Sequence, residues 1–456
     1  MFSGRFSIDR VLGTHIGRWG SVELWAALVA TAIACILFKQ GNITRSFWDV
    51  RIRIYVGALV VLYLILTINI ILFTEQSSWL RGLLDHVIFA LNIWLILVLL
   101  STADSLQKMA QIAVIITCMV GILWHIGVLT ADGRLMGILL TSKLTIYRLE
   151  FFGFSSALFL AFIKPKKVRN CYLISAIFLL YTISITLAIA AVIAAIMAIL
   201  WMLFWQLTFK QYQKALCVVV ISLITITMFV FTKAEYYTSQ VNARVNAAGT
   251  VLHNKWINGR DERIIMIANR LQGVTHLSFS ELNEEEQSII RTYAHLHNIE
   301  IPQKEQFRTF LWGLSHELII FDGSERINFA LVALQDWSRH KLFGQGLGNY
   351  SVSNMIRWTY DYETVHYPHN IFLEMLAGAG LVGFGTFCLV LFMAFILVQQ
   401  TGVNFSPNCV FFGALMFYLV SACFAGDYYD FRLCWFTALF AMCAYRGTFP
   451  EGQLER

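Results

Sequence analysis

The sequence predicts an all-α protein, a polytopic transmembrane helical bundle of about 11–12 spans with one large, mostly helical periplasmic loop. Composition is the first observation: 58% of the 456 residues are hydrophobic and 14% are charged, against roughly 25% charged in soluble domains. The second is a set of stretches free of Asp, Glu, Lys and Arg that approach or exceed the about 20 residues of a bilayer-spanning helix. They are 54–73, 172–205, 216–232 and 381–398. A soluble cytosolic enzyme is therefore not expected.

Apolar runs locate the individual spans, the longest being the 34 residues of 172–205. One helix of that length would measure about 51 Å, against about 30 Å of hydrocarbon. Basic residues flank the run on both sides, and the positive-inside rule places both flanks in the cytoplasm. We therefore expect a hairpin turning near Thr182–Thr186. The spans are 22–38, 54–73, 83–100, 109–129, 149–163, two within 172–205, 215–232, 380–398, 409–425 and 433–446.

The segment 233–366 stands apart, because it holds 28 of the 62 charged residues. The same rule puts it outside the cytoplasm and the basic loop 39–53 inside. Helices are expected at 260–270, at 281–297 with Ser280 as N-cap, and at 327–337. The expected domains are N-terminal transmembrane helices (1–232), a periplasmic loop domain (233–368) and C-terminal transmembrane helices (369–456).

The charge of +6 calls for no nucleic-acid partner, since membrane proteins concentrate basic residues in cytoplasmic loops. All nine cysteines lie in or beside apolar stretches, which gives neither a disulfide framework nor a zinc site. His366 and His369 with Glu363 do not have a reliable metal-ligand spacing. No metal and no cofactor are expected, and the apolar run from Leu24 is interpreted as an uncleaved helix.

The stretch from Gly344 to Gly383 is the most informative for chemistry. It opens with Phe343-Gly-Gln-Gly-Leu-Gly-Asn-Tyr350, where glycines permit positive φ and N–H groups could face an anion. A structural turn is the alternative, since no Lys-Ser/Thr follows as in a P-loop. His369 and Asn370 come directly after Pro368, as expected at the mouth of a helix. A histidine there would lie at the membrane–water boundary on the side away from the cytoplasm, and it could take a proton from a sugar hydroxyl.

These residues resemble the O-antigen ligase and O-antigen polymerase superfamily of bacterial membrane glycosyltransferases. The resemblance rests on His369-Asn370 followed by Gly380 and Gly383, on the glycine-rich stretch before them and on the large preceding loop, and it covers about 326–398. It implies metal-independent transfer of a glycan from undecaprenyl diphosphate at the periplasmic face of the cell inner membrane. The acceptor would be lipid A-core for a ligase or another lipid-linked glycan for a polymerase.

The resemblance implies His369 as the base, Asn370 as its neighbour and Arg326 as an arginine that meets donor phosphate. The family's further arginine is missing from Ser184-Ile-Thr-Leu-Ala188, so a second phosphate clamp would come from elsewhere. Arginine suits a diphosphate because its guanidinium group is always charged and donates in a bidentate fork, while histidine titrates near neutral pH. The expected substrate-binding residues are Asn370, Arg134, Arg339, Arg244, Gly346 and Gly348, with His369 and Arg326 as catalytic residues.

Purely structural roles are the alternatives to these catalytic roles. His369 could simply start a helix, and Arg326 could pair with Asp322 or Glu325 on a solvated loop. The other histidines of the segment are expected at the surface. A transporter or flippase is the competing class, and its signature would be ionisable groups deep inside spans. Such groups are expected near span ends here: Glu23, Arg81, Asp85, Lys108, Glu150 and Glu374.

Overall fold

The structure is a computed structural model of the full chain. It describes residues 28–29, 32, 35, 50–74, 76–99, 103–125, 134–135, 139–140, 143–186, 188–251, 261–271, 277–296, 300–302, 307, 310–311, 314, 325–349, 368–400, 408–425, 428 and 431–446. The described residues divide into two compact units. The first unit consists of Met1–Ile71, Trp79–Ala234 and Gly383–Arg456, and the second unit consists of Leu72–Ser78 and Glu235–Val382.

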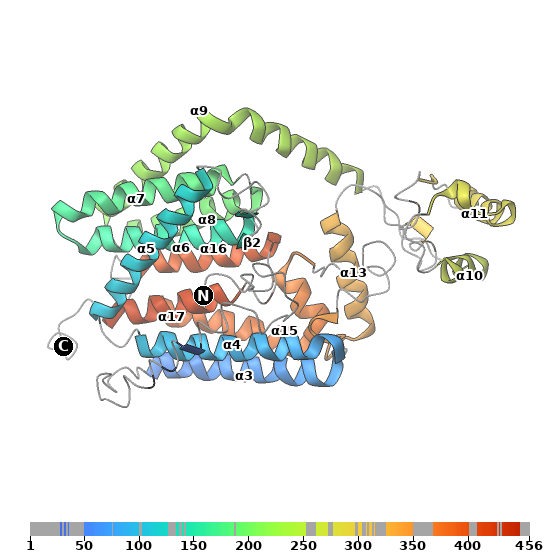
Figure 1. Ribbon diagram of the computed structural model, residues 1–456, viewed down its shortest axis with the longest axis horizontal. Coiled ribbons are helices and arrows are strands. Elements are labelled where there is room, and N and C mark those ends of the chain that lie inside the picture. The colour runs from blue at the N-terminus through green and yellow to red at the C-terminus, as the bar shows by residue number, and fades with distance from the viewer. Residues whose placement is uncertain are drawn as a thin grey trace. The chain divides into compact units, whose positions relative to one another are not determined.

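The described chain is almost entirely helical, as Figure 1 shows. One two-residue antiparallel ribbon, β1 (Arg134–Leu135) with β2 (Leu139–Leu140), is the exception. The helices are α3 (Val50–Phe73), α4 (Gln76–Leu99), α5 (Ala103–His125), α6 (Lys143–Ile163), α7 (Lys166–Ile185), α8 (Ile189–Thr208), α9 (Tyr212–Val251), α10 (Glu262–Arg270), α11 (Glu284–Leu296), α13 (Glu325–Arg339), α15 (Ile371–Gln400), α16 (Asn408–Ala425) and α17 (Arg432–Arg446).

Seven of the described helices are long and apolar enough to cross a membrane, and three shorter apolar segments accompany them. Large apolar side chains on their outer faces are exposed, for example Leu223 and Phe231 of α9. Burial of apolar surface drives folding in water, so faces of this kind indicate a lipid surround. The all-α polytopic bundle is confirmed. The expected total of 11–12 spans stays a prediction, because most of 22–38 lies outside the described residues.

Two helices in place of one are confirmed for the apolar run at 172–205, which forms α7 and α8. Helix α7 ends at Ile185, with the N–H of its C-cap Thr186 bonded to the carbonyl of Thr182, so the break lies at the C-terminal end of the expected turn Thr182–Thr186. Two helices of 20 residues each measure about 30 Å, which matches the hydrocarbon core. Helix length relative to bilayer thickness was therefore sufficient to locate this turn.

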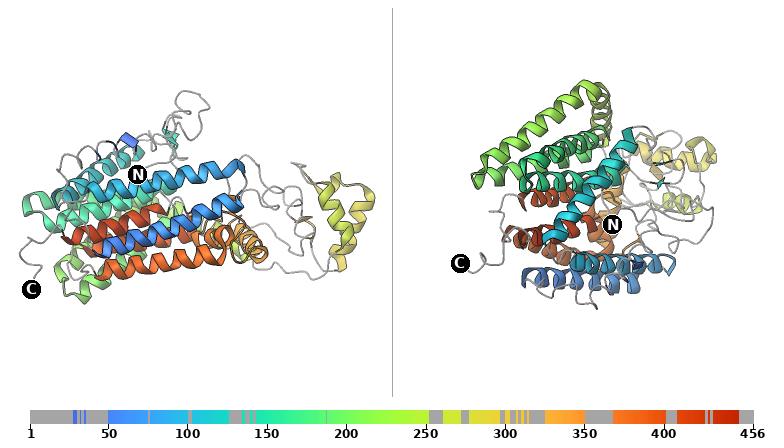
Figure 2. Two further views of the ribbon diagram at one scale, coloured as in Figure 1. Left: turned by 90° about the horizontal axis from the view of Figure 1, so that it is seen from below. Right: turned by 60° about the vertical axis from the view of Figure 1, so that its left-hand side comes forward.

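The core of the first unit forms around α6, which packs on α5, α7 and α16. In its apolar span 89% of the residues are buried, against 22–39% in the other six long apolar helices. The ring of Phe151 stacks on Phe417 of α16 with centroids 3.7 Å apart. Helices α3 and α4 run side by side in both Figure 1 and Figure 2, and Tyr63 stacks on Phe89 between them.

The second unit has its own apolar core, and it carries most of the polar segment. Side chains of α10, α11, α13 and the first turns of α15 contribute, among them Ile267, Tyr293, Phe329 and Ala377. The expected helices 260–270 and 327–337 are present as α10 and α13. The first 20 residues of α9 match the expected span 215–232, but the helix continues to Val251.

The predicted N-cap at Ser280 is wrong. Ser280 lies inside a 3-10 turn, Phe279–Glu281, and α11 begins at Glu284. Asn283 is the N-cap instead, because its side-chain oxygen accepts from the N–H of Glu286 at 2.8 Å while the Glu286 carboxylate accepts from the N–H of Asn283 at 3.3 Å. This is a capping box built on Asn-x-x-Glu, and it competes with the Ser-containing alternative three residues earlier.

Candidate functional site

The site forms around a break in α15 at Gly380, where φ is 63° and ψ is −166°. A continuous helix would bond the N–H groups of residues 381 and 382 to the carbonyls of 377 and 378. The loop after α13 takes over all four groups. Leu381 and Val382 donate to the carbonyls of Lys341 and Leu342 at 2.9 and 3.1 Å, and the carbonyls of Ala377 and Gly378 accept from Gln345 and Gly346 at 2.9 Å. We call this loop, residues 340–349, the glycine loop.

Two glycines make this pairing possible. A Cβ on Gly380 would lie 2.4 Å from the backbone of Gly344 and Leu342, and a Cβ on Gly344 would lie 2.4 Å from the Gly378 carbonyl. Both residues also have positive φ, which is costly for residues with a side chain. The glycines that the sequence singled out in two separate motifs therefore meet face to face.

Side chains fix the glycine loop to one further segment of the second unit, Leu72–Ser78. Asn349 donates through Nδ2 to the carbonyl of Phe73 at 2.8 Å and to that of Gln345 at 2.6 Å. Thr74 donates to the carbonyl of Leu347 at 2.7 Å. The carbonyl of Phe73 ends α3 and has no intrahelical partner, so Asn349 satisfies a group that helix geometry leaves open.

The carboxyl group of Asp336 lies under the glycine loop and is 7% exposed. Gln345 donates to its Oδ2 through Nε2 at 3.1 Å. Burial raises the pKa of Asp336 to about 7, and the hydrogen bond from Gln345 and the charge of Arg339 oppose this rise. The group therefore changes charge near neutral pH, inside the structure that holds α15.

His369 and Asn370 lie at the start of α15, as the sequence predicts. Asn370 is the N-cap, since its Oδ1 accepts from the N–H groups of Phe372 and Leu373 at 2.9 and 3.2 Å. His369 has φ of 56°, a left-handed conformation that is uncommon for residues other than glycine and asparagine. Its half-buried ring stacks on Phe329 of α13 with centroids 5.7 Å apart. The backbone and the ring contact together fix where the imidazole lies.

The other predicted site residues divide between the units. Arg326, Arg339 and Arg244 belong to the second unit, whereas Arg134 lies in β1 of the first. Arg339 ends α13 and is exposed, while the side chains of Arg326, Arg134 and Arg244 lie outside the described part. Gly346 donates its N–H to Gly378 within the fold, so that amide is already used. Gly348 is exposed with φ of 90°.

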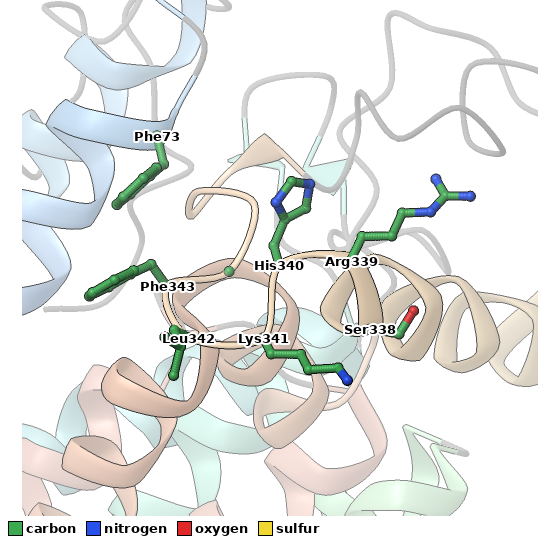
Figure 3. Close-up of a pocket in the computed structure, with 8 residues that line it drawn as sticks. Phe73, Ser338, Arg339, His340, Lys341, Leu342 and Phe343 are labelled. Atoms are coloured by element: carbon green, nitrogen blue, oxygen red, sulfur yellow. The ribbon is translucent and has the colours of Figure 1, made fainter.

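An open hollow of about 370 Å³ lies at the end of α13. Figure 3 shows the rings of Phe73 and Phe343 facing each other on one side of it, with Arg339, His340 and Lys341 following in sequence along the other. The two rings are stacked, with centroids 5.8 Å apart. His340 is exposed, as is His295 of α11, in agreement with the sequence expectation for these two histidines.

Sequence reasoning missed several polar residues that the structure places in organised positions. Asp336, Gln345 and Asn349 hold the glycine loop, and the interleaving of polar residues with three glycines was the available signal. In the first unit, Arg148 and Glu150 are buried near the start of α6. Both carboxylate oxygens of Glu150 lack a hydrogen-bond partner among the described residues.

No set of three or more His, Cys, Asp and Glu side chains in the described ranges could hold a metal ion. Comparison of the chain with protein-family models gives no match. Comparison with curated proteins gives none either. The residues and their geometry are therefore the basis for any functional conclusion.

Proposed function

We propose that this protein is an integral-membrane glycosyltransferase of O-antigen ligase type, acting at the periplasmic face of a bacterial inner membrane. The donor is a glycan on undecaprenyl diphosphate and the acceptor is a hydroxyl group of lipid A-core. His369 takes the proton from that hydroxyl, its oxygen attacks the anomeric carbon, and the bond from this carbon to the diphosphate oxygen breaks with inversion. Undecaprenyl diphosphate leaves with the electron pair, stabilised by Arg326 and one further arginine.

One observation carries the proposal. The glycine loop and the segment from His369 to Val382, which resemble the family as two separate motifs, form a single hydrogen-bonded structure. A base must be held in a defined position to act on a bound hydroxyl group. The N-cap at Asn370 and the ring contact with Phe329 restrict the position of His369.

The chemical argument supports histidine in the role of base. An acceptor hydroxyl needs a group that is unprotonated, yet basic enough, near neutral pH, and imidazole meets this requirement better than a carboxylate does. The left-handed backbone at His369 is a further argument, since residues held in sparsely populated conformations gather at functional sites. A purely structural N′ position would favour glycine or asparagine there.

The test is transfer by the purified full chain from undecaprenyl-diphosphate-linked glycan to lipid A-core. The variant His369→Asn tolerates positive φ but cannot act as the base, so the transfer rate is expected to fall by roughly 10²–10⁴. His295→Asn is the matched control, because His295 is an exposed histidine of the same unit. Equal transfer by the His369→Asn variant and the parent protein would contradict the proposal.

The acceptor distinguishes the two activities that share this chemistry. A ligase transfers to lipid A-core, and a polymerase transfers to a second undecaprenyl-linked glycan. Offering both acceptors in one assay separates them by product size. Elongation of the lipid-linked glycan with no product on lipid A-core would replace the ligase assignment by a polymerase assignment at the same site.

A transporter is the second candidate function, and the burial of Glu150 favours it. An ionisable group inside a membrane bundle often binds a coupling ion or a substrate. Glu150 is fully buried in α6, seven residues after the helix begins, or about 10 Å along its axis. Flux of ions or lipid-linked glycan in proteoliposomes, lost in Glu150→Gln and without any glycan transfer, would favour this function over the transferase.

A further inference from the structure

We infer that the hollow at the end of α13 binds the phosphate headgroup of an anionic membrane lipid. The binding surface consists of Arg339, His340 and Lys341 on the polar side and Phe73, Leu342 and Phe343 on the apolar side. We call it the lipid-headgroup hollow. The inference is tested apart from glycan transfer, by lipid labelling without a glycan donor or acceptor.

The polar side has the charge that an anionic headgroup requires. Arg339 and Lys341 are exposed cations, and His340 lies between them. The carboxyl group of Asp336, one turn before Arg339 in α13, is buried beneath the loop and has its pKa raised to about 7 by burial. A cation in the last turn of a helix also complements the helix dipole. That effect accounts for Arg339 but not for Lys341, which follows the helix.

The apolar side of the hollow consists of large apolar side chains that are exposed, which is unfavourable in contact with water. The exposed fractions are 42% for Phe73, 59% for Leu342 and 51% for Phe343. These residues are contiguous, since the two aromatic rings stack and Leu342 precedes Phe343 in the chain. An exposed apolar patch beside cations is the pattern of a membrane-interface surface, where acyl chains cover the apolar part and phosphates meet the basic part.

The position of Phe73 places the hollow at the depth of a headgroup. Phe73 is the last residue of α3, whose 24 residues form one of the spans. Aromatic residues at the end of a span gather at the headgroup level. Because Asn349 and Thr74 hold the glycine loop to this helix end, the backbone of the residues that line the hollow is fixed beside Phe73. A preformed backbone limits the entropy lost on binding.

The occupant is a membrane lipid and not free phosphate, because the apolar residues make up half of the surface. A free phosphate ion would leave Phe73, Leu342 and Phe343 exposed. A lipid covers them with its glycerol and upper acyl chain, so both sides of the hollow are used. This difference determines the design of the experiment.

The experiment uses the full chain in nanodiscs that contain phosphatidylglycerol carrying a photoreactive diazirine on its acyl chain near the headgroup. Irradiation is expected to attach the lipid to residues of the segment 338–344, mapped by mass spectrometry. Phosphatidylcholine with the same acyl chain is the control lipid and should label this segment much less. The Arg339→Ala/Lys341→Ala variant should weaken labelling by about 30-fold, given the contribution of a cation near an anionic surface.

Lys166→Ala/Lys167→Ala is the matched control variant, since it also removes two exposed cations but from the start of α7. Labelling of 338–344 should be unchanged in it. Phe343→Ala should reduce labelling by roughly fivefold, because part of the apolar contact is lost. All the replaced residues are exposed, and an unchanged thermal midpoint verifies that each variant is folded.

Three results would overturn the inference. Equal labelling by phosphatidylglycerol and phosphatidylcholine would show no headgroup recognition. Unchanged labelling in the Arg339→Ala/Lys341→Ala variant would show that the cations do not bind. Loss of labelling when inorganic phosphate is added would identify a site for a free anion instead of a lipid. Glycan transfer is measured separately, because Arg339 is also one of the residues expected to bind the donor.

Discussion

Replacing Gly380 with alanine tests the break in α15 most sharply. The new Cβ would lie 2.4 Å from the backbone nitrogen of Gly344 and from the carbonyl carbon and oxygen of Leu342. Backbone atoms at that distance have to move. The movement separates the glycine loop from Leu381 and Val382, whose N–H groups now donate to it. Alanine at φ of 63° also carries a conformational cost.

The magnitude follows from these parts. The φ and ψ of Gly380 lie in a region that is essentially restricted to glycine, and a residue with a Cβ there costs about 1–3 kcal/mol. Each of the two hydrogen bonds donated by Leu381 and Val382 is worth about 1 kcal/mol net. We therefore expect Gly380→Ala to destabilise the pairing by about 3–5 kcal/mol, which corresponds to a factor of at least roughly 10² in an opening equilibrium.

Gly385→Ala is the matched control in the same helix. A Cβ there meets nothing within 4 Å. Alanine has a higher helix propensity than glycine, so this change should be neutral or stabilise α15 by up to about 1 kcal/mol. The two variants add the same methyl group five residues apart and are expected to act in opposite directions.

Hydrogen exchange of the full chain in detergent micelles is the assay, read at the amides of Leu381 and Val382. These amides should exchange at least roughly 10² times faster in Gly380→Ala and no faster in Gly385→Ala. Equal protection in the two variants would refute the reasoning, because it would mean that the loop and the helix break are not paired.

Three further predictions concern the surroundings of the glycine loop. The native state keeps the proton on Asp336 up to about pH 7, whereas the ordinary pKa is 3.8. The stability of the native state therefore falls as the pH rises through that interval, by about 2 kcal/mol between pH 5 and 7. Asp336→Asn should remove this dependence, and a parental amide protection that is unchanged from pH 5 to 8, after correction for intrinsic exchange, would contradict it. Asn349→Ala removes two hydrogen bonds from a buried side chain and should destabilise the loop by about 2–3 kcal/mol in chemical unfolding. Gly348→Ala is the comparison variant, because it strains the neighbouring backbone at positive φ and keeps both hydrogen bonds. Asn370→Ala removes the N-cap of α15 and should cost about 1 kcal/mol, while Asn370→Asp should keep most of it; equal stability of these two variants would exclude the capping role.

Spans and their hairpin could be predicted from the sequence because bilayer thickness is a fixed length. The run at 172–205 is too long for one helix and basic on both flanks, and α7 and α8 form as expected. The boundary of α15 was harder to predict. The apolar run suggests a start at 380, but the helix begins at Ile371, because Asn370 caps it and the first turns pack in the apolar core of the second unit.

The candidate site was predictable only in part. The position of His369 at a helix start follows from Pro368 and Asn370 in sequence. The pairing between the glycine loop and the Gly380 break involves residues more than thirty positions apart, and no local pattern encodes such a contact. The predicted anion cradle treated the glycine N–H groups as free. The amide of Gly346 instead donates to the carbonyl that the break releases at Gly378.

Burial of charge could not be predicted either. Glu150 was expected near a span end, and along α6 it does lie near the start of the helix. Its full burial depends on how α6 packs at the centre of the bundle, which one helix's sequence does not reveal. Two charged residues, Arg148 and Glu150, near the start of an apolar helix were the available signal.

The central claim is that the imidazole of His369 takes a proton during glycan transfer, and His369→Gly with added imidazole tests it most directly. Glycine relieves the left-handed strain at this position, which stabilises the fold by about 1–2 kcal/mol. Loss of the ring contact with Phe329 and the greater freedom of the unfolded chain destabilise the fold by a similar amount, so the variant should fold. We predict transfer reduced by roughly 10²–10⁴ and partly restored by imidazole, with rescue rising as the pH passes the imidazole pKa. Transfer by His369→Gly at the parental rate, with no response to imidazole, would contradict the account.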